Sequence, residues 1–164
     1  MTLAKISFAT RSDIFTEVAT SEVQPDKAIM DIKFSVKSNS SRFAETYNKH
    51  SNPPYRVHLN IDGQTIILES EPILEDKSPV DSNLPESGIG WRYQFSKRLA
   101  LSPGKHTLQI ALPVDEVFFE REIDLHAGLN IISIMPGYNK RSLRPFKGQH
   151  FTAGVKMLDV TLNP

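Results

Sequence analysis

The chain has 164 residues, a length that fits one domain whose core needs no disulfide. Its 19 basic and 19 acidic residues give a formal net charge of zero. Long-range attraction therefore favours neither double-stranded nucleic acid nor an acidic membrane surface as a partner. There is no cysteine, which excludes disulfides and thiolate chemistry.

The N-terminus lacks the basic and apolar regions of a secretory signal. We therefore expect a cytoplasmic protein, or a protein of the periplasm or cell envelope whose signal was removed. Charged residues or prolines interrupt every apolar run before it reaches the length of a spanning helix, so no transmembrane segment is expected.

Apolar and polar residues alternate along much of the chain, which predicts strands with one buried face. Asp62-Gly63 separates two such segments, 55–61 and 64–68, as in a two-residue β-hairpin turn. Pro136-Gly137 is expected to end the strand that begins at Asn130. The other expected strands are 30–36, 91–101, 106–112, 117–125 and 151–162, the last with a bulge between Met157 and Leu158, and 3–9 and 14–19 alternate less completely.

Eight or nine short strands separated by turn residues predict an all-β fold, a single antiparallel β-sandwich over residues 1–164. Its core should consist of the apolar residues that share the two-residue period. These are Met30, Ile32, Phe34, Val57, Leu59, Ile61, Trp91, Tyr93, Phe95, Leu108, Ile110, Val117, Phe119, Ile123, Ile132, Ile134, Val155 and Val160.

A Pro-Gly turn at Pro103-Gly104 precedes the strand that contains His106. The segment 101–110 resembles the start of a late strand in immunoglobulin-like and fibronectin-like modules, including those of bacterial envelope proteins. The resemblance covers about ten residues and implies an immunoglobulin-like sandwich in which the His106 ring bonds back to the backbone of residues 101–104. A corner of this kind is structural and carries no function by itself.

Two long loops are expected, 69–90 and 136–150. The first is acidic, and its carboxylates suggest three interpretations: a solvated loop, ligands for calcium, or an acid and base pair acting on a glycoside. These carboxylates belong to Glu69, Glu71, Glu75, Asp76, Asp81 and Glu86.

The second loop combines cations with aromatic rings. Such a cluster offers stacking surfaces and contacts to anions, although an ordinary solvated loop has the same composition. We predict a binding site there, formed by Tyr138, Lys140, Arg141, Arg144 and Phe146.

The sequence contains no Gly-x-Ser-x-Gly elbow, no Gly-rich phosphate loop and no histidine pair at metal-ligand spacing, so no catalytic residue, cofactor or metal is predicted. The function expected is a non-catalytic module that binds a protein or a glycan through loops at one end of the sandwich. Two alternatives stay open. One is a carbohydrate-acting enzyme that uses the carboxylates of loop 69–90. The other is a structural subunit whose edge strands pair with another chain, including a second copy.

Overall fold

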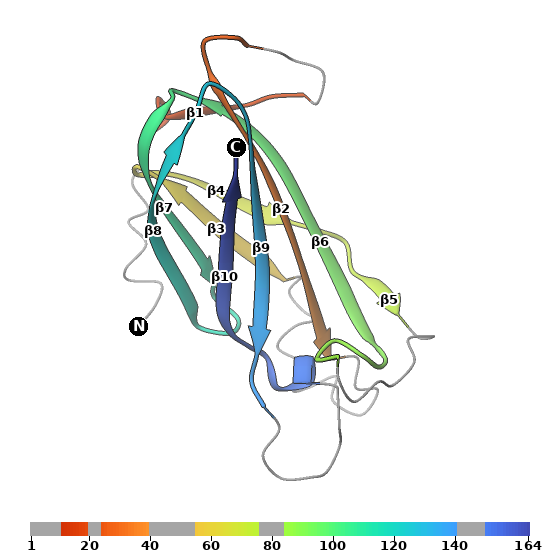
Figure 1. Ribbon diagram of the computed structural model, residues 1–164. Helices are drawn as coiled ribbons and strands as arrows, with labels where there is room; N and C mark the ends of the chain where they lie inside the picture. Colours follow the sequence, from red (N-terminus) through yellow and green to blue (C-terminus); the bar gives the residue numbers. More distant parts are fainter. Residues whose placement is uncertain (1–10, 20–23, 40–54, 76–83, 141–149) are drawn as a thin grey trace.

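The computed structural model describes residues 11–19, 24–39, 55–75, 84–140 and 150–164. They form two β-sheets that pack against each other (Figure 1). The larger sheet has the order β1 (Phe15–Glu17), β6 (Gly90–Leu101), β2 (Ala28–Asn39), β9 (Gly128–Tyr138) and β10 (Val155–Asn163), and β5 (Ile73–Glu75) also pairs with β6. The smaller sheet has the order β4 (Gln64–Glu69), β3 (Arg56–Ile61), β7 (Gly104–Leu112) and β8 (Val117–Leu125). A short 3₁₀ helix, η2 (His150–Ala153), precedes β10.

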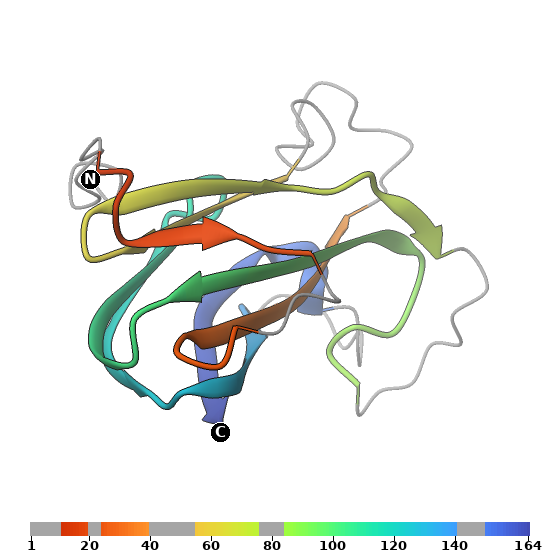
Figure 2. The same ribbon diagram turned by 90° about the horizontal axis from the view of Figure 1, so that it is seen from above.

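The predicted all-β sandwich is confirmed, and its core lies between the two layers seen from above in Figure 2. Aromatic rings occupy its centre, where Phe34 and Phe95 stack with their centroids 5.6 Å apart. Sixteen of the eighteen predicted core residues belong to the buried cluster, and the other two, Trp91 and Phe119, pack half-buried against it. No helix in the described part of the chain is both long and apolar enough to cross a membrane.

One strand pair differs from the antiparallel prediction. β2 and β9 run parallel, in register from Ala28 opposite Gly128 to Phe34 opposite Ile134. Alternation shows which face of a strand is buried and not the direction of its neighbour, so this pair could not be predicted from it. The pairing of β2 with β9 ends at Phe34 and Ile134, and beyond these residues the two strands diverge (Figure 1).

Some predicted boundaries were wrong. β9 continues through Pro136-Gly137 to Tyr138. Because β2 has already left β9, a proline at this position breaks no bond between those strands. The register shift in β10 lies between Val155 and Met157, and the expected loop 69–90 contains the short strand β5. The described residues hold ten strands, and segment 3–9 lies outside them.

The predicted corner at His106 is confirmed. The ring is buried, and its Nε2 lies 2.8 Å from the carbonyl oxygen of Ser102. Its Nδ1 lies 2.6 Å from Oδ2 of Asp62, while Oδ1 of the same carboxylate accepts the backbone N–H of Thr107 at 2.7 Å. Asp62 and Gly63 both have positive φ, 48° and 96°, as the predicted hairpin turn requires. His106 thereby ties the β6–β7 turn to the β3–β4 turn.

Candidate functional site

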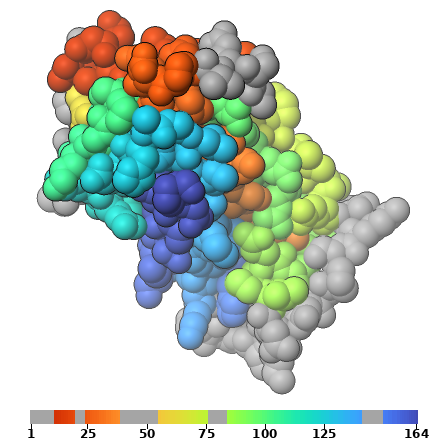
Figure 3. Space-filling view, turned by 45° about the horizontal axis from the view of Figure 1, so that its top comes forward, coloured from red at the N-terminus to blue at the C-terminus, as the bar shows by residue number. Residues whose placement is uncertain are grey.

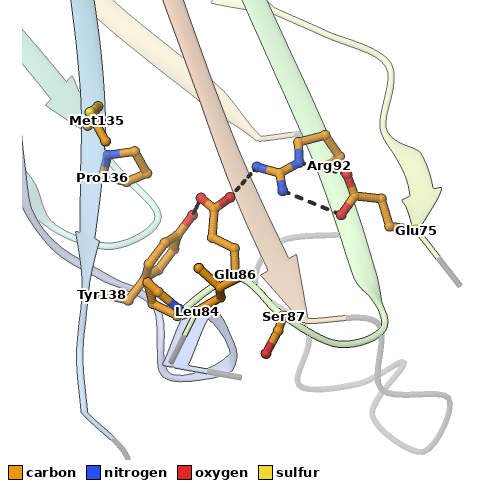
Figure 4. A pocket seen from close by; sticks show the side chains of 9 residues that line it. Glu75, Leu84, Glu86, Ser87, Arg92, Met135, Pro136 and Tyr138 are labelled. Carbon is orange, nitrogen blue, oxygen red and sulfur yellow. Dashed lines mark hydrogen bonds and ion pairs between the residues drawn. The ribbon is translucent and has the colours of Figure 1, made fainter. Parts of the chain in front are cut away.

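An open pocket of about 470 Å³ lies where β2 and β9 part (Figure 4). Its apolar wall consists of Leu84, Pro85, Met135 and Pro136. Its polar wall consists of Glu75, Glu86, Arg92 and Tyr138. These side chains come from β5, β6, β9 and the segment that leads into β6, so the pocket forms only when distant parts of the chain fold together.

Tyr138 spans the gap between the two parted strands. Its hydroxyl accepts the backbone N–H of Lys37 at 3.0 Å and donates to Oε1 of Glu86 at 2.5 Å. The first bond replaces a ladder bond that β9 no longer supplies to β2. Burial, followed by the charge of Glu86, raises the pKa of Tyr138 above its usual value, so the hydroxyl keeps its proton.

Arg92 joins the two carboxylates of the pocket, as Figure 4 shows. Its Nε lies 2.9 Å from Oε1 of Glu75, and its Nη1 lies 2.6 Å from Oε2 of Glu86. Nη1 also donates to Oγ of Ser35 at 3.1 Å. Burial alone would lower the pKa of Arg92, but the hydrogen bonds and charges of the two carboxylates outweigh burial and raise it.

Lys37 lies beneath this pair with its side chain fully buried. Its Nζ donates to the carbonyl oxygens of Glu86, at 2.9 Å, and Gly88, and forms an ion pair of 2.8 Å with Oε2 of Glu75. Nζ also lies 4.9 Å from the centre of the Phe151 ring, within the range of a cation–π contact. A buried ammonium needs such partners, because an unpaired charge is costly to remove from water.

The charges of this network balance. Lys37 and Arg92 supply two positive charges, and Glu75 and Glu86 supply two negative ones. Burial alone would raise the pKa of Glu75, but Arg92 and Lys37 outweigh burial and lower it. The polar wall is therefore a set of ion pairs with both carboxylates engaged.

The predicted binding residues are only partly brought to this site. Tyr138 belongs to β9 and lines the pocket, so its expected place in a loop was wrong. Lys140 is exposed, two residues farther along the chain. Arg141, Arg144 and Phe146 lie outside the described residues.

Two acids of the expected loop 69–90, Glu75 and Glu86, line the pocket. Glu69 instead pairs with Arg56 at 2.7 Å, and Asp76 and Asp81 lie outside the described residues. Within the described ranges, no three His, Cys, Asp or Glu side chains come close enough to hold a metal ion.

Sequence reasoning missed Lys37 and Arg92, because their positions in the alternation predict a solvated face. Both lie on the outer face of the larger sheet, opposite each other across β2 and β6. At this end of the sheet, β5 and the segment before β6 cover the outer face. No pattern in the sequence around Lys37 or Arg92 indicates that these segments lie there. Gly90 reflects this close packing, because a Cβ at position 90 would lie 2.6 Å from the carbonyl oxygen of Ser38 and 2.7 Å from the Phe151 ring.

Comparison of the chain with protein-family models, with curated proteins and with solved structures gives no significant match. The pocket and the contacts around it are therefore the basis for a functional assignment.

Proposed function

We propose that this protein is a non-catalytic binding module that holds a segment of a partner protein in the pocket lined by β5, β6, β9 and the segment before β6. The observation that carries the proposal is the exposed apolar wall beside a charge network that is already complete. Leu84 is 57% exposed and Met135 is 66% exposed, although both line a concave site. Large apolar side chains gathered at a pocket mark interaction sites more often than isolated ones do.

The wall chemistry favours a protein over a glycan. Methionine is flexible and polarizable, and it adapts to the apolar side chains of a partner. Sugar rings are usually held on exposed aromatic faces, and the one aromatic residue among the described residues that line this pocket, Tyr138, is half-buried with its hydroxyl bonded to Lys37 and Glu86. Trp91, the sole tryptophan of the chain, does not line the pocket. A glycan partner is the second outcome that the experiment below distinguishes.

The carboxylates favour binding over glycoside hydrolysis. A general acid in a glycosidase requires a raised pKa. The pKa of Glu75 is lowered, and Glu86 is bound to both Arg92 and Tyr138. These contacts make the two acids parts of the wall rather than proton donors.

Contacts at the sheet margins favour a pocket over assembly through edge strands. Arg121 of β8 donates to the carbonyl oxygen of Val160 on β10 at 3.1 Å. The side chain of Gln64 bonds the backbone N–H groups of Ile14 and Phe15, both at 2.9 Å. Side chains thus occupy one carbonyl group of β10 and two N–H groups at the start of β1, and such groups would otherwise be open to pairing with another chain.

We also propose that the sandwich is a variant of the immunoglobulin-like modules. The support is the bond from the His106 ring to the preceding turn, the feature that the resemblance implied. Modules of this kind commonly bind partners at one end of the sandwich, and the pocket lies at one end of β2 and β6.

A random peptide library and a glycan array, both applied to the immobilised protein, test the proposed function. We expect peptides to be selected, and Met135→Ser to weaken the best of them about tenfold, the loss expected for one buried apolar side chain. Ile67→Ser removes a similarly exposed apolar group, 47% exposed on β4, and should leave affinity unchanged. Binding of glycans without peptides, or equal effects of the two substitutions, would contradict the proposal.

A further inference from the structure

We propose that the segment bound in this pocket is basic as well as apolar, with an arginine or lysine whose head group reaches Glu75 and Glu86. This inference rests on the proposed function and adds the charge of the partner. It follows from which charges of the network face the pocket.

The exposed side of the network is more negative than its total charge. The side chains of Glu75 and Glu86 are 33% and 30% exposed. Those of the two cations, Arg92 and Lys37, are 16% and 0% exposed. Part of the positive charge that balances Glu75 belongs to Lys37, whose side chain is buried. A ligand that enters the pocket therefore meets the carboxylates first.

Unused hydrogen-bonding capacity points the same way. A carboxylate offers about four acceptor sites. Glu86 accepts one bond from Arg92 and one from Tyr138, so acceptor sites are left over. Arg92 carries about five N–H donors, and its Nε, Nη1 and Nη2 already serve Glu75, Glu86 and Ser35. The wall can therefore accept more bonds than it can donate, which suits a cationic ligand and disfavours an anionic one.

The apolar wall suits the stem of the same side chain. Arginine and lysine carry three or four methylene groups that pack along apolar surface while the charged head stays polar. Met135 and Pro136 stand on β9 across the pocket from Arg92 and Glu75 (Figure 4). A side chain that enters between them meets carbon on one side and carboxylate on the other.

The neighbouring surface leaves room for more of the segment. A second hollow lies on the same outer face of the larger sheet and is lined in part by Ser35, Gln94, Ser133 and the cation Lys33, so the basic residue of the segment belongs in the first hollow. Ser35 joins the two hollows, since it also accepts a bond from Arg92. The space-filling view shows β10, β9, β2 and β6 side by side on this face (Figure 3). An extended peptide of several residues fits this arrangement better than a single small molecule.

Two substitutions at one exposed position test the sign of the charge. Met135→Lys and Met135→Glu both remove the apolar group, and since Met135 is 66% exposed we expect both variants to fold. The probe is the tightest peptide selected from the random library, labelled with a fluorophore and measured by anisotropy. We expect the selected pool to be enriched in arginine and lysine, and Met135→Lys to weaken binding at least about tenfold more than Met135→Glu.

A second pair of variants tests the carboxylate. Glu86→Gln keeps an acceptor for Tyr138 and removes the charge, so the affinity for the basic peptide should fall about threefold to tenfold. Glu122→Gln on β8 makes the same change at an exposed residue of the other sheet and should have no effect. Thermal unfolding of each variant shows that it is folded.

The possible results separate the two proposals. A neutral or acidic peptide pool that still depends on the Met135 side chain overturns the basic partner and leaves the binding module intact. Equal affinity of the Lys and Glu variants does the same. Absence of any peptide binding that depends on Met135 overturns the proposed function itself.

Discussion

The two ends of strand β6 are built in different ways. At its C-terminal end, His106 joins two tight turns whose residues can be recognised along the chain, Asp62-Gly63 and Pro103-Gly104. At its N-terminal end, Arg92 joins carboxylates from separate segments above a buried lysine. The first end is formed by two turns whose residue types mark them in the sequence, whereas the second end carries no such mark and borders an open pocket. Surplus exposed apolar surface and spare acceptors occur at the second end, where we place the partner.

The largest expected effect is the loss of the buried ammonium. Lys37→Met keeps most of the side-chain volume but leaves the carbonyl oxygens of Glu86 and Gly88 without their donor and Glu75 without one of its two cations. We expect the free energy of unfolding to fall by about 2–4 kcal/mol, measured by urea denaturation. Lys33→Met on the same strand, at a side chain that is 63% exposed, should change it by less than about 0.5 kcal/mol. Equal effects would show that the network adds nothing to stability.

Glycine-to-alanine substitutions at the two ends of β6 should destabilise the fold for different reasons, a steric clash at Gly90 and backbone strain at Gly104. At Gly90 a Cβ would clash with the backbone oxygen of Ser38, so Gly90→Ala should cost about 2–3 kcal/mol. At Gly104 nothing lies within 4 Å, but φ is +117°, so Gly104→Ala should cost about 1–2 kcal/mol through backbone strain alone. Chemical denaturation of both variants checks the order, and a larger loss at Gly104 would contradict the close packing at the pocket end.

Loss of the polar bonds of the corner ring should cost about as much as the backbone strain at Gly104. His106→Phe keeps the packing and loses the bonds to Asp62 and Ser102, which should lower the free energy of unfolding by about 1–2 kcal/mol. Peptide affinity should not change, because the corner lies at the other end of β6. His126→Phe, at an exposed ring, is the matched control. A loss of affinity in His106→Phe without a loss of stability would place function at the corner instead.

The smallest effect concerns pH. The pKa of Glu75 is lower in the folded chain than in the unfolded one, so its ionisation stabilises the fold above the unfolded pKa. That contribution should disappear as the pH falls from about 4.5 through the lower folded pKa. Urea denaturation between pH 7 and pH 3 should therefore show a shallower loss of stability in Glu75→Gln than in the parent chain. Parallel pH profiles would mean that the pair with Arg92 and Lys37 is not maintained in solution.

The comparison of the two ends also explains how far the sequence could be interpreted. The alternation of apolar and polar residues predicted the strands and most of the core, because apolar residues at every second position, such as Ile32 and Phe34, mark the buried face of a strand. Turn residues predicted the hairpin at Asp62 and the corner at His106. The pocket could not be predicted, since Lys37 carries the same local signal as the exposed Lys33. Only the three-dimensional arrangement of β5, β9 and the segment before β6 separates them.

The most direct test of this account is a ¹H–¹⁵N correlation spectrum of the protein titrated with the selected basic peptide. We expect shifts at the backbone amides of Leu84, Glu86, Ser87, Arg92 and Tyr138, which line the pocket. We expect unchanged signals at Asp62, Ser102 and His106. Shifts concentrated at those corner residues, with none around the pocket, would contradict the assignment of the binding site to the end where β2 and β9 part.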